Sequence, residues 1–71
     1  MNTSVRPESI SIQEGRARLE AADFKLMDGA SDPRFEIWLD KHGCPNIINY
    51  VGSGQLVRYL KKDIDEAVPI N

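Results

Sequence analysis

The chain has 71 residues, 9 Lys and Arg, 11 Asp and Glu, and a formal net charge of −2. This length predicts a single small domain with a modest core. Phosphate-binding domains are usually basic, so the charge makes nucleic acid the less favoured partner. No apolar run is long enough to predict a membrane span.

The single cysteine and the first residues of the chain indicate the cellular compartment in which the protein is expected. The single cysteine, Cys44, cannot form a disulfide within the chain, and the start lacks the apolar segment of a secretory signal. We therefore expect a reducing, cytoplasmic environment.

The N-terminal half predicts an arm followed by a helix. Residues 1–10 are polar and aperiodic, so we interpret them as an arm preceding one domain over residues 11–71. Ser11 and Glu14 have the spacing of a capping box at a helix start. Apolar positions then recur at helical spacing up to Ala22. Residues 24–27 are predicted as a short strand, with a longer helix as the alternative.

Residues 34–40 form the clearest predicted strand, because side chains alternate there with a period of two. We expect Phe35, Ile37 and Leu39 to face the core and Trp38 to face away from it. Residues 41–45 then predict a hairpin turn with Gly43 and Pro45, and residues 46–51 return as the next strand.

The C-terminal part predicts a turn and a final helix. Gly52 and Gly54 mark the turn, and Ser53 is the expected N-cap. A stripe at helical spacing follows, formed by Leu56, Leu60, Ile64 and Ala67. The whole order predicts an α+β fold: a helix, an antiparallel sheet of two or three strands, and a second helix, with both helices on one sheet face.

Chemically distinctive residues cluster around the hairpin. Trp38, His42 and Cys44 are the only residues of their types and lie within seven positions. A Cys–His nucleophile needs a third orienting group, and zinc needs three or four ligands. We therefore predict no catalytic residue, no metal and no cofactor, and a protein that is not an enzyme. The turn before the final helix is a weaker candidate for anion binding than for ordinary capping.

The predicted interaction surface is the sheet face that carries Trp38. An exposed apolar patch on a small domain often marks a binding site, and tryptophan is common at binding hot spots. The predicted partner-binding residues are Met27, Glu36, Trp38, Ile47, Asn49 and Val51. A protein partner is favoured and a homodimer is also considered. The competing interpretation is that Val5 and Ile10 of the arm cover this face.

Basic residues on the two predicted helices suggest the alternative, an RNA- or DNA-contacting domain. These residues are Arg16, Arg18, Arg58, Lys61 and Lys62. Acidic neighbours are interleaved with the last three, which favours a solvated helical face.

Three stretches between residues 19 and 64, LEAADFKLM, RFEIWLDKHG and GSGQLVRYLKKDI, carry a family resemblance. Their order resembles the double-stranded-RNA-binding fold, and in particular the HicA-type mRNA interferase toxins. The resemblance implies an αβββα topology. The family's catalytic histidine lies in a Gly-Ser-His stretch, where this chain reads Gly29-Ala30-Ser31-Asp32-Pro33, so the resemblance does not extend to RNA cleavage.

The sequence therefore predicts a small, non-enzymatic binding protein with a regulatory or inhibitory role. It would act by occupying a surface of a larger protein or complex. Proteins of this size and composition are often inhibitors encoded by phages or mobile elements. This comparison is an analogy with other small proteins and is not inferred from particular residues.

Overall fold

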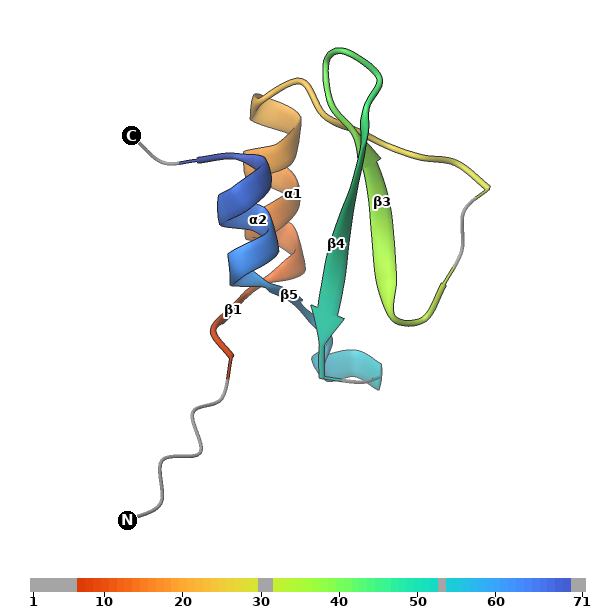
Figure 1. Ribbon diagram of the computed structural model, residues 1–71. Helices are drawn as coiled ribbons and strands as arrows, with labels where there is room; N and C mark the ends of the chain where they lie inside the picture. Colours follow the sequence, from red (N-terminus) through yellow and green to blue (C-terminus); the bar gives the residue numbers. More distant parts are fainter. Residues whose placement is uncertain (1–6, 30–31, 53, 70–71) are drawn as a thin grey trace.

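The computed structural model describes residues 7–29, 32–52 and 54–69. The chain forms a five-stranded antiparallel sheet and two α-helices (Figure 1). The elements are β1 (Ser9–Ile10), α1 (Ile12–Ala21), β2 (Lys25–Leu26), β3 (Phe35–Leu39), β4 (Pro45–Val51), a 3-10 turn (Gly54–Leu56), β5 (Arg58–Leu60) and α2 (Lys61–Ala67).

The strand order in the sheet is β1-β5-β4-β3-β2, and every neighbouring pair is antiparallel. The helices α1 and α2 lie side by side against one face of this sheet, as Figure 1 shows. The α+β class and the antiparallel sheet are confirmed, but the expected number of strands was too small. Three of the strands are only two or three residues long, and such short segments leave no alternating pattern to read.

The first helix follows the sequence signals closely. The Ser11 hydroxyl accepts a hydrogen bond from the Glu14 N–H at 3.0 Å, which caps the helix start. At the other end Asp23 has a φ of 67°, a conformation that Asp tolerates better than most residues, and the chain turns there into β2. The predicted strand over residues 24–27 is thus present, and the longer-helix alternative is wrong.

The last residues of the expected N-terminal arm belong to the sheet. Ser9 and Ile10 pair with Leu60 and Tyr59 of β5, and the Ile10 side chain is buried in the core. Val5, which was considered as a cover for the sheet, lies outside the described residues.

The predicted final helix begins too early by several residues. Arg58–Leu60 is a strand, α2 starts at Lys61, and Leu56 is 80% exposed instead of packing in the core. Tyr59 is the reason for the difference. Tyr59 is not one of the residues at helical spacing that were expected to face the core. It is nevertheless fully buried, because β5 pairs with both β1 and β4. The predicted cap, Ser53, lies outside the described residues.

The core lies between the helices and the sheet. Its fully buried side chains come from β1, both helices, β3, β4 and β5: Ile10, Leu19, Trp38, Ile48, Tyr59 and Ile64. Leu19 and Ile64 bring α1 and α2 onto the same group of strand residues. Because this core is small, each of its larger side chains contributes a substantial share of the stability.

Gly15 allows α1 to lie directly on Tyr59, and this contact gives a prediction with an unusual sign. Glycine within a helix normally costs about 1 kcal/mol relative to alanine. Here an added Cβ would collide with the Tyr59 ring and come within 3.3 Å of the Ile10 Cδ1. Gly15→Ala is therefore expected to destabilise the protein by about 1–3 kcal/mol, because the core is overpacked.

Urea unfolding followed by circular dichroism measures this effect. Ala17→Gly, at an exposed position of the same helix, is the matched control and should show the ordinary helix preference for alanine. A Gly15→Ala protein more stable than the parent would contradict the close packing of α1 on Tyr59.

Candidate protein-binding face

The sheet has one face under the helices and one face turned away from them. We call the second the outer sheet face. Its apolar residues come from β3, β4 and the residue after β2: Met27, Phe35, Ile37, Leu39, Ile47 and Val51. The register fixes this grouping, since Ile37 pairs directly with Ile47 and paired residues point to the same side.

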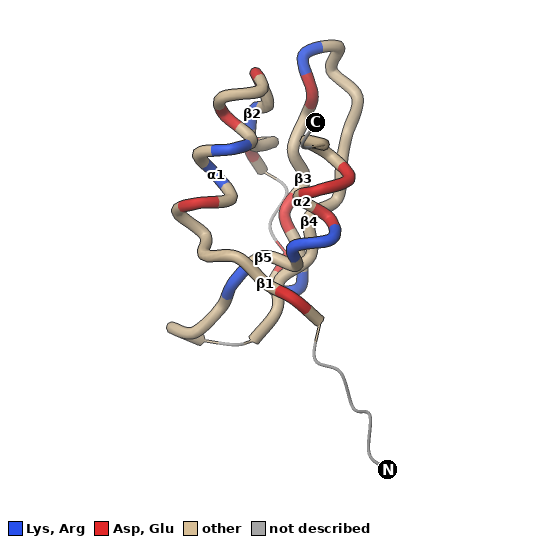
Figure 2. The backbone as a smooth tube through the Cα atoms, turned by 90° about the vertical axis from the view of Figure 1, so that its left-hand side faces the viewer, with Lys and Arg blue, Asp and Glu red and all other residues tan. Residues whose placement is uncertain are grey.

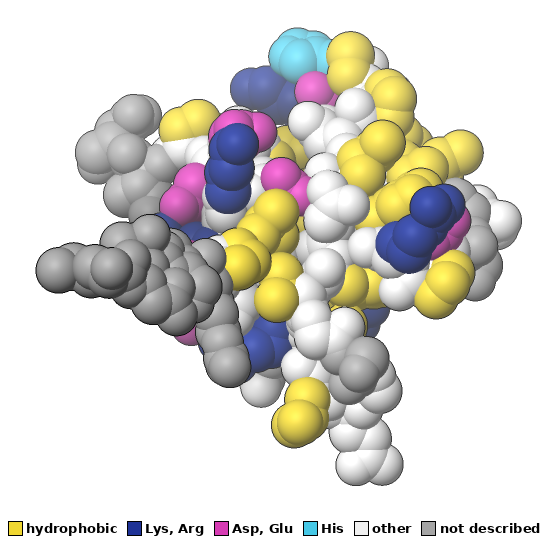
Figure 3. Space-filling model, turned by 60° about the horizontal axis from the view of Figure 1, so that its bottom comes forward, with side chains coloured by type: hydrophobic (Ala, Val, Ile, Leu, Met, Phe, Trp, Pro, Cys, Tyr) yellow, Lys and Arg dark blue, Asp and Glu magenta, His cyan; other side chains and the backbone are white. Residues whose placement is uncertain are grey.

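Side chains of the outer sheet face remain accessible to solvent. Ile47 is 55% exposed and Met27 is 41% exposed, and the other apolar members are partly exposed. Figure 3 shows hydrophobic side chains gathered on the right of the view, below the hairpin tip that carries the histidine. An exposed apolar area on a small domain often marks an interaction site.

The predicted orientation of Trp38 is wrong. Its side chain is 1% exposed and packs in the core beneath the helices. Glu36 shares that inner face, because Glu36 pairs with Ile48 and Trp38 pairs with Asn46. Two residues predicted to bind a partner are thus turned away from the outer sheet face.

Glu36 can face inward because several donors converge on its carboxylate. Tyr50 and Tyr59 donate their hydroxyls at 2.5 and 2.6 Å, and the Trp38 indole Nε1 donates at 2.8 Å. Arg16 of α1 adds an ion pair at 3.0 Å. The Glu36 side chain is 10% exposed, so a charged group is almost completely enclosed by hydrogen-bond donors.

These contacts determine the titration of the cluster. Burial alone would raise the pKa of Glu36, but hydrogen bonds from Tyr50, Tyr59, Trp38 and Arg16 together hold the pKa below its usual value. Burial, and then the carboxylate itself, raise the pKa of Tyr50 to about 12. The cluster is consequently a charged carboxylate held by neutral hydroxyls across the ordinary pH range, which is a structural arrangement that fixes Trp38 in the core.

The remaining predicted partner residues lie on the outer sheet face or at its border. Ile47, Val51 and Met27 belong to the outer sheet face as expected. Asn49 also points to that side, but its backbone N–H and side-chain amide both donate to Asp63 of α2, at 2.9 and 2.7 Å. The amide of Asn49 is therefore engaged within the protein.

His42 and Cys44 are exposed at the tip of the β3–β4 hairpin. The Asp40 carboxylate accepts hydrogen bonds from the backbone N–H groups of both residues, at 2.8 and 2.9 Å. Gly43, with a φ of 82°, completes the turn. Within the described residues, no three or more His, Cys, Asp or Glu side chains are placed to hold a metal ion.

The basic residues considered for nucleic-acid contact are largely engaged in ion pairs. Arg16 pairs with Glu36, and Arg18 and Lys61 both pair with Asp65. Figure 2 shows both acidic and basic residues on each of the two helices. The helices therefore present a mixed charge pattern.

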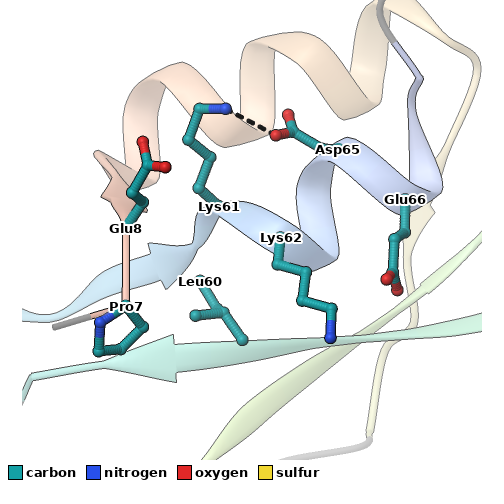
Figure 4. A pocket seen from close by; sticks show the side chains of 7 residues that line it. All are labelled: Pro7, Glu8, Leu60, Lys61, Lys62, Asp65 and Glu66. Atoms are coloured by element: carbon teal, nitrogen blue, oxygen red, sulfur yellow. Dashed lines mark hydrogen bonds and ion pairs between the residues drawn. The ribbon is translucent and has the colours of Figure 1, made fainter. Parts of the chain in front are cut away.

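Arg58 and Lys62, the other two basic candidates, lie apart from these ion pairs. Arg58 donates to the hydroxyl and the carbonyl oxygen of Ser9. Lys62 lines a hollow of about 590 Å³ between the start of the described chain and α2 (Figure 4). The hollow is lined by Pro7, Glu8, Leu60, Lys61, Lys62, Asp65 and Glu66. Its charged residues carry both signs, and Lys61 already pairs with Asp65 across it.

The structure contradicts the idea that the glycine turn at residues 52–54 leads directly into a helix whose start could bind an anion. Residues 54–56 form a single 3-10 turn that leads into β5, and α2 begins later, at Lys61. The α2 N-cap, Leu60, contributes no side-chain hydrogen bond.

The residues that sequence reasoning missed are Phe35, Ile37 and Leu39. They were expected in the core, and the structure places them on the outer sheet face beside Ile47. The signal that could have found them was the adjacent strand. Ile48 of that strand is buried, and its pairing with Glu36 fixes the orientation of all of β3.

None of the described helices is long and apolar enough to cross a membrane.

Comparisons with known proteins identify no relative of this chain. The chain matches no known protein family, no curated protein and no solved structure.

Proposed function

We propose that this protein is a small non-enzymatic binding protein that docks on a larger protein through its outer sheet face. Its role would be regulatory or inhibitory, by occupying a surface of the partner. The observation that supports the proposal is the pairing of Ile37 with Ile47 in the middle of an apolar face that no described helix or strand covers. Leaving such side chains in water brings no advantage to the isolated domain.

The nucleic-acid alternative receives less support from the same residues. Arg16, Arg18 and Lys61 are paired with carboxylates, and their charges are locally compensated. The domain as a whole is acidic. Binding through phosphates requires several free cations on one surface, and the helices present a mixture of both signs.

A substitution on the outer sheet face tests the proposal. Ile47→Asp places a charge in the centre of the face without removing a core side chain. We expect the tagged variant to retain at least tenfold less of a specific partner than the parent protein, in affinity capture from a lysate of the source cells followed by mass spectrometry.

Leu56→Asp is the matched control, because Leu56 is an exposed apolar residue in the 3-10 turn between β4 and β5. Capture should be unchanged in this variant, and circular dichroism should show both variants folded. Equal capture by the parent and Ile47→Asp would rule out the outer sheet face as the docking surface.

A further inference from the structure

The turn after β2 contains the pair Asp28-Gly29, and Asp28 is the only aspartate of the chain that precedes a glycine. Both residues are exposed. Gly29 has a φ of 84°, and apart from its chain neighbours no atom of the described residues lies within 4 Å of the place that a Cβ would take. Because there is no Cβ and the space is open, the backbone nitrogen of Gly29 is sterically accessible to the carboxyl group of Asp28.

The surroundings of Asp28 differ from those of the other aspartates. Four of the others have carboxylates that accept hydrogen bonds from donors elsewhere in the protein: Asp32, Asp40, Asp63 and Asp65. At Asp23, the N–H of the following residue, Phe24, donates to the carbonyl oxygen of Leu19 at 3.0 Å. Within the described residues, neither the Asp28 carboxylate nor the Gly29 N–H has a hydrogen-bond partner. The fold therefore holds neither of the two groups in place.

We propose that Asp28 is a site of spontaneous covalent modification, where the link to Gly29 rearranges to isoaspartate through a succinimide. The Gly29 nitrogen attacks the Asp28 Cγ, loses its proton and forms a C–N bond, while one carboxyl oxygen leaves as water. A second water then opens the ring. Attack at Cγ restores aspartate, and attack at the backbone carbonyl carbon leaves isoaspartate. One water is released and one is consumed, so the rearrangement needs no oxidant and no cofactor.

The modification changes the length of the chain between β2 and β3. Isoaspartate keeps the negative charge, but the backbone then runs through the Asp28 side chain and gains one methylene carbon. Met27 lies immediately before this point, and its N–H donates to the Ile37 carbonyl oxygen at 2.9 Å. The extra carbon therefore enters the chain at the border of the outer sheet face. The inference is independent of what this face binds.

Incubation of the folded protein for several weeks, at physiological temperature and mildly acidic pH, tests the proposal. Trypsin cleaves after Lys25 and Arg34, so the peptide of residues 26–34 contains both Asp28 and Asp32. Asp32 is an internal control, because Pro33 has no backbone N–H from which a succinimide could form. We expect a second chromatographic form of this peptide with unchanged mass. Electron-transfer fragmentation should locate the isoaspartate at position 28, with about tenfold less or none at position 32.

Two comparisons connect the result to the structure. Asp28→Glu keeps the carboxylate at this exposed position, but its longer side chain closes the cyclic imide far more slowly, so the second form should be absent. A synthetic peptide of residues 26–34 gives the rate without the fold, and the folded protein should react within about tenfold of it. A protein that reacts more slowly than this would show that the fold protects Asp28, and the proposal would fail. Equal isoaspartate at positions 28 and 32, or an unchanged second form in Asp28→Glu, would also overturn it.

Discussion

Trp38→Ala is expected to lower the melting temperature by roughly 15 °C or more. The substitution removes the largest fully buried side chain of the described residues, and Phe/Trp→Ala changes in cores cost about 3–5 kcal/mol. A chain of 71 residues has a total stability of only about 4–10 kcal/mol. The substitution should therefore remove between about a third and all of the stability of the protein. Thermal unfolding followed by circular dichroism provides the measurement.

Leu56→Ala is the comparison for this experiment, because Leu56 is 80% exposed and its truncation should change stability by no more than about 0.5 kcal/mol. The fluorescence of the single tryptophan gives an independent check. Its emission in the parent should be blue-shifted and resistant to iodide quenching. A Trp38→Ala protein with an unchanged melting temperature would place the indole outside the core. Loss of partner binding in this variant would report loss of the fold, not removal of a contact.

Glu36→Ala should cost about 2–4 kcal/mol, which is the second largest expected effect. The substitution leaves the hydroxyls of Tyr50 and Tyr59 and the Trp38 indole without their acceptor in a mostly enclosed site. The accessible side of Arg16 allows some water to compensate, so the expected cost is below that of a fully buried pair. Urea unfolding of the parent and the variant measures the difference.

Glu36→Gln separates the charge from the shape of the side chain. Glutamine fills the same volume but cannot accept from all of these donors, so most of the destabilisation should remain. Asp32→Asn is the control, since it removes a carboxylate from an exposed ion pair with Arg34, and little change is expected. Equal effects at Asp32 and Glu36 would contradict the enclosed cluster.

The pH dependence of stability should carry the signature of this cluster. The folded-state pKa of Glu36 lies below the ordinary value of 4.5, so its stabilising contribution is complete above that pH and is lost as the pH falls through the folded pKa. The pKa of Tyr50 is raised from 10 to about 12, so its contribution is lost as the pH rises above 10. Stability should therefore be nearly constant between about pH 5 and 10, and Glu36→Gln should abolish the Glu36 component of the acid-side loss.

The parts of the fold that could be predicted are those with long, periodic patterns. The capped helix after Ser11, the strand around Trp38 and the return strand around Ile48 all appear near their expected positions. The short strands β1 and β5 could not be predicted, because β1 pairs with a strand about 50 residues away in the chain and β5 is a three-residue strand held between β1 and β4. The residues within such a short strand do not indicate which distant strand it will pair with.

The candidate site was half predictable for a different physical reason. An alternating strand indicates which residues share a face, but not which face is buried. The expected orientation placed Phe35, Ile37 and Leu39 in the core, and Glu36 and Trp38 on the opposite side. The convergence of Tyr50, Tyr59 and Arg16 on that carboxylate reverses the choice, and it depends on three separate elements.

The pairing of β5 with β4 at Tyr50 and Val51 also bears on aggregation. Among the described residues, no strand lies beside the rest of that edge of β4, and open strand edges commonly recruit other chains. Pro45 brings no N–H to this edge, and Asp63 occupies the N–H of Asn49. A foreign strand would find Ile47 as the one remaining N–H donor between them, so the native protein is guarded against growth into fibrils along β4.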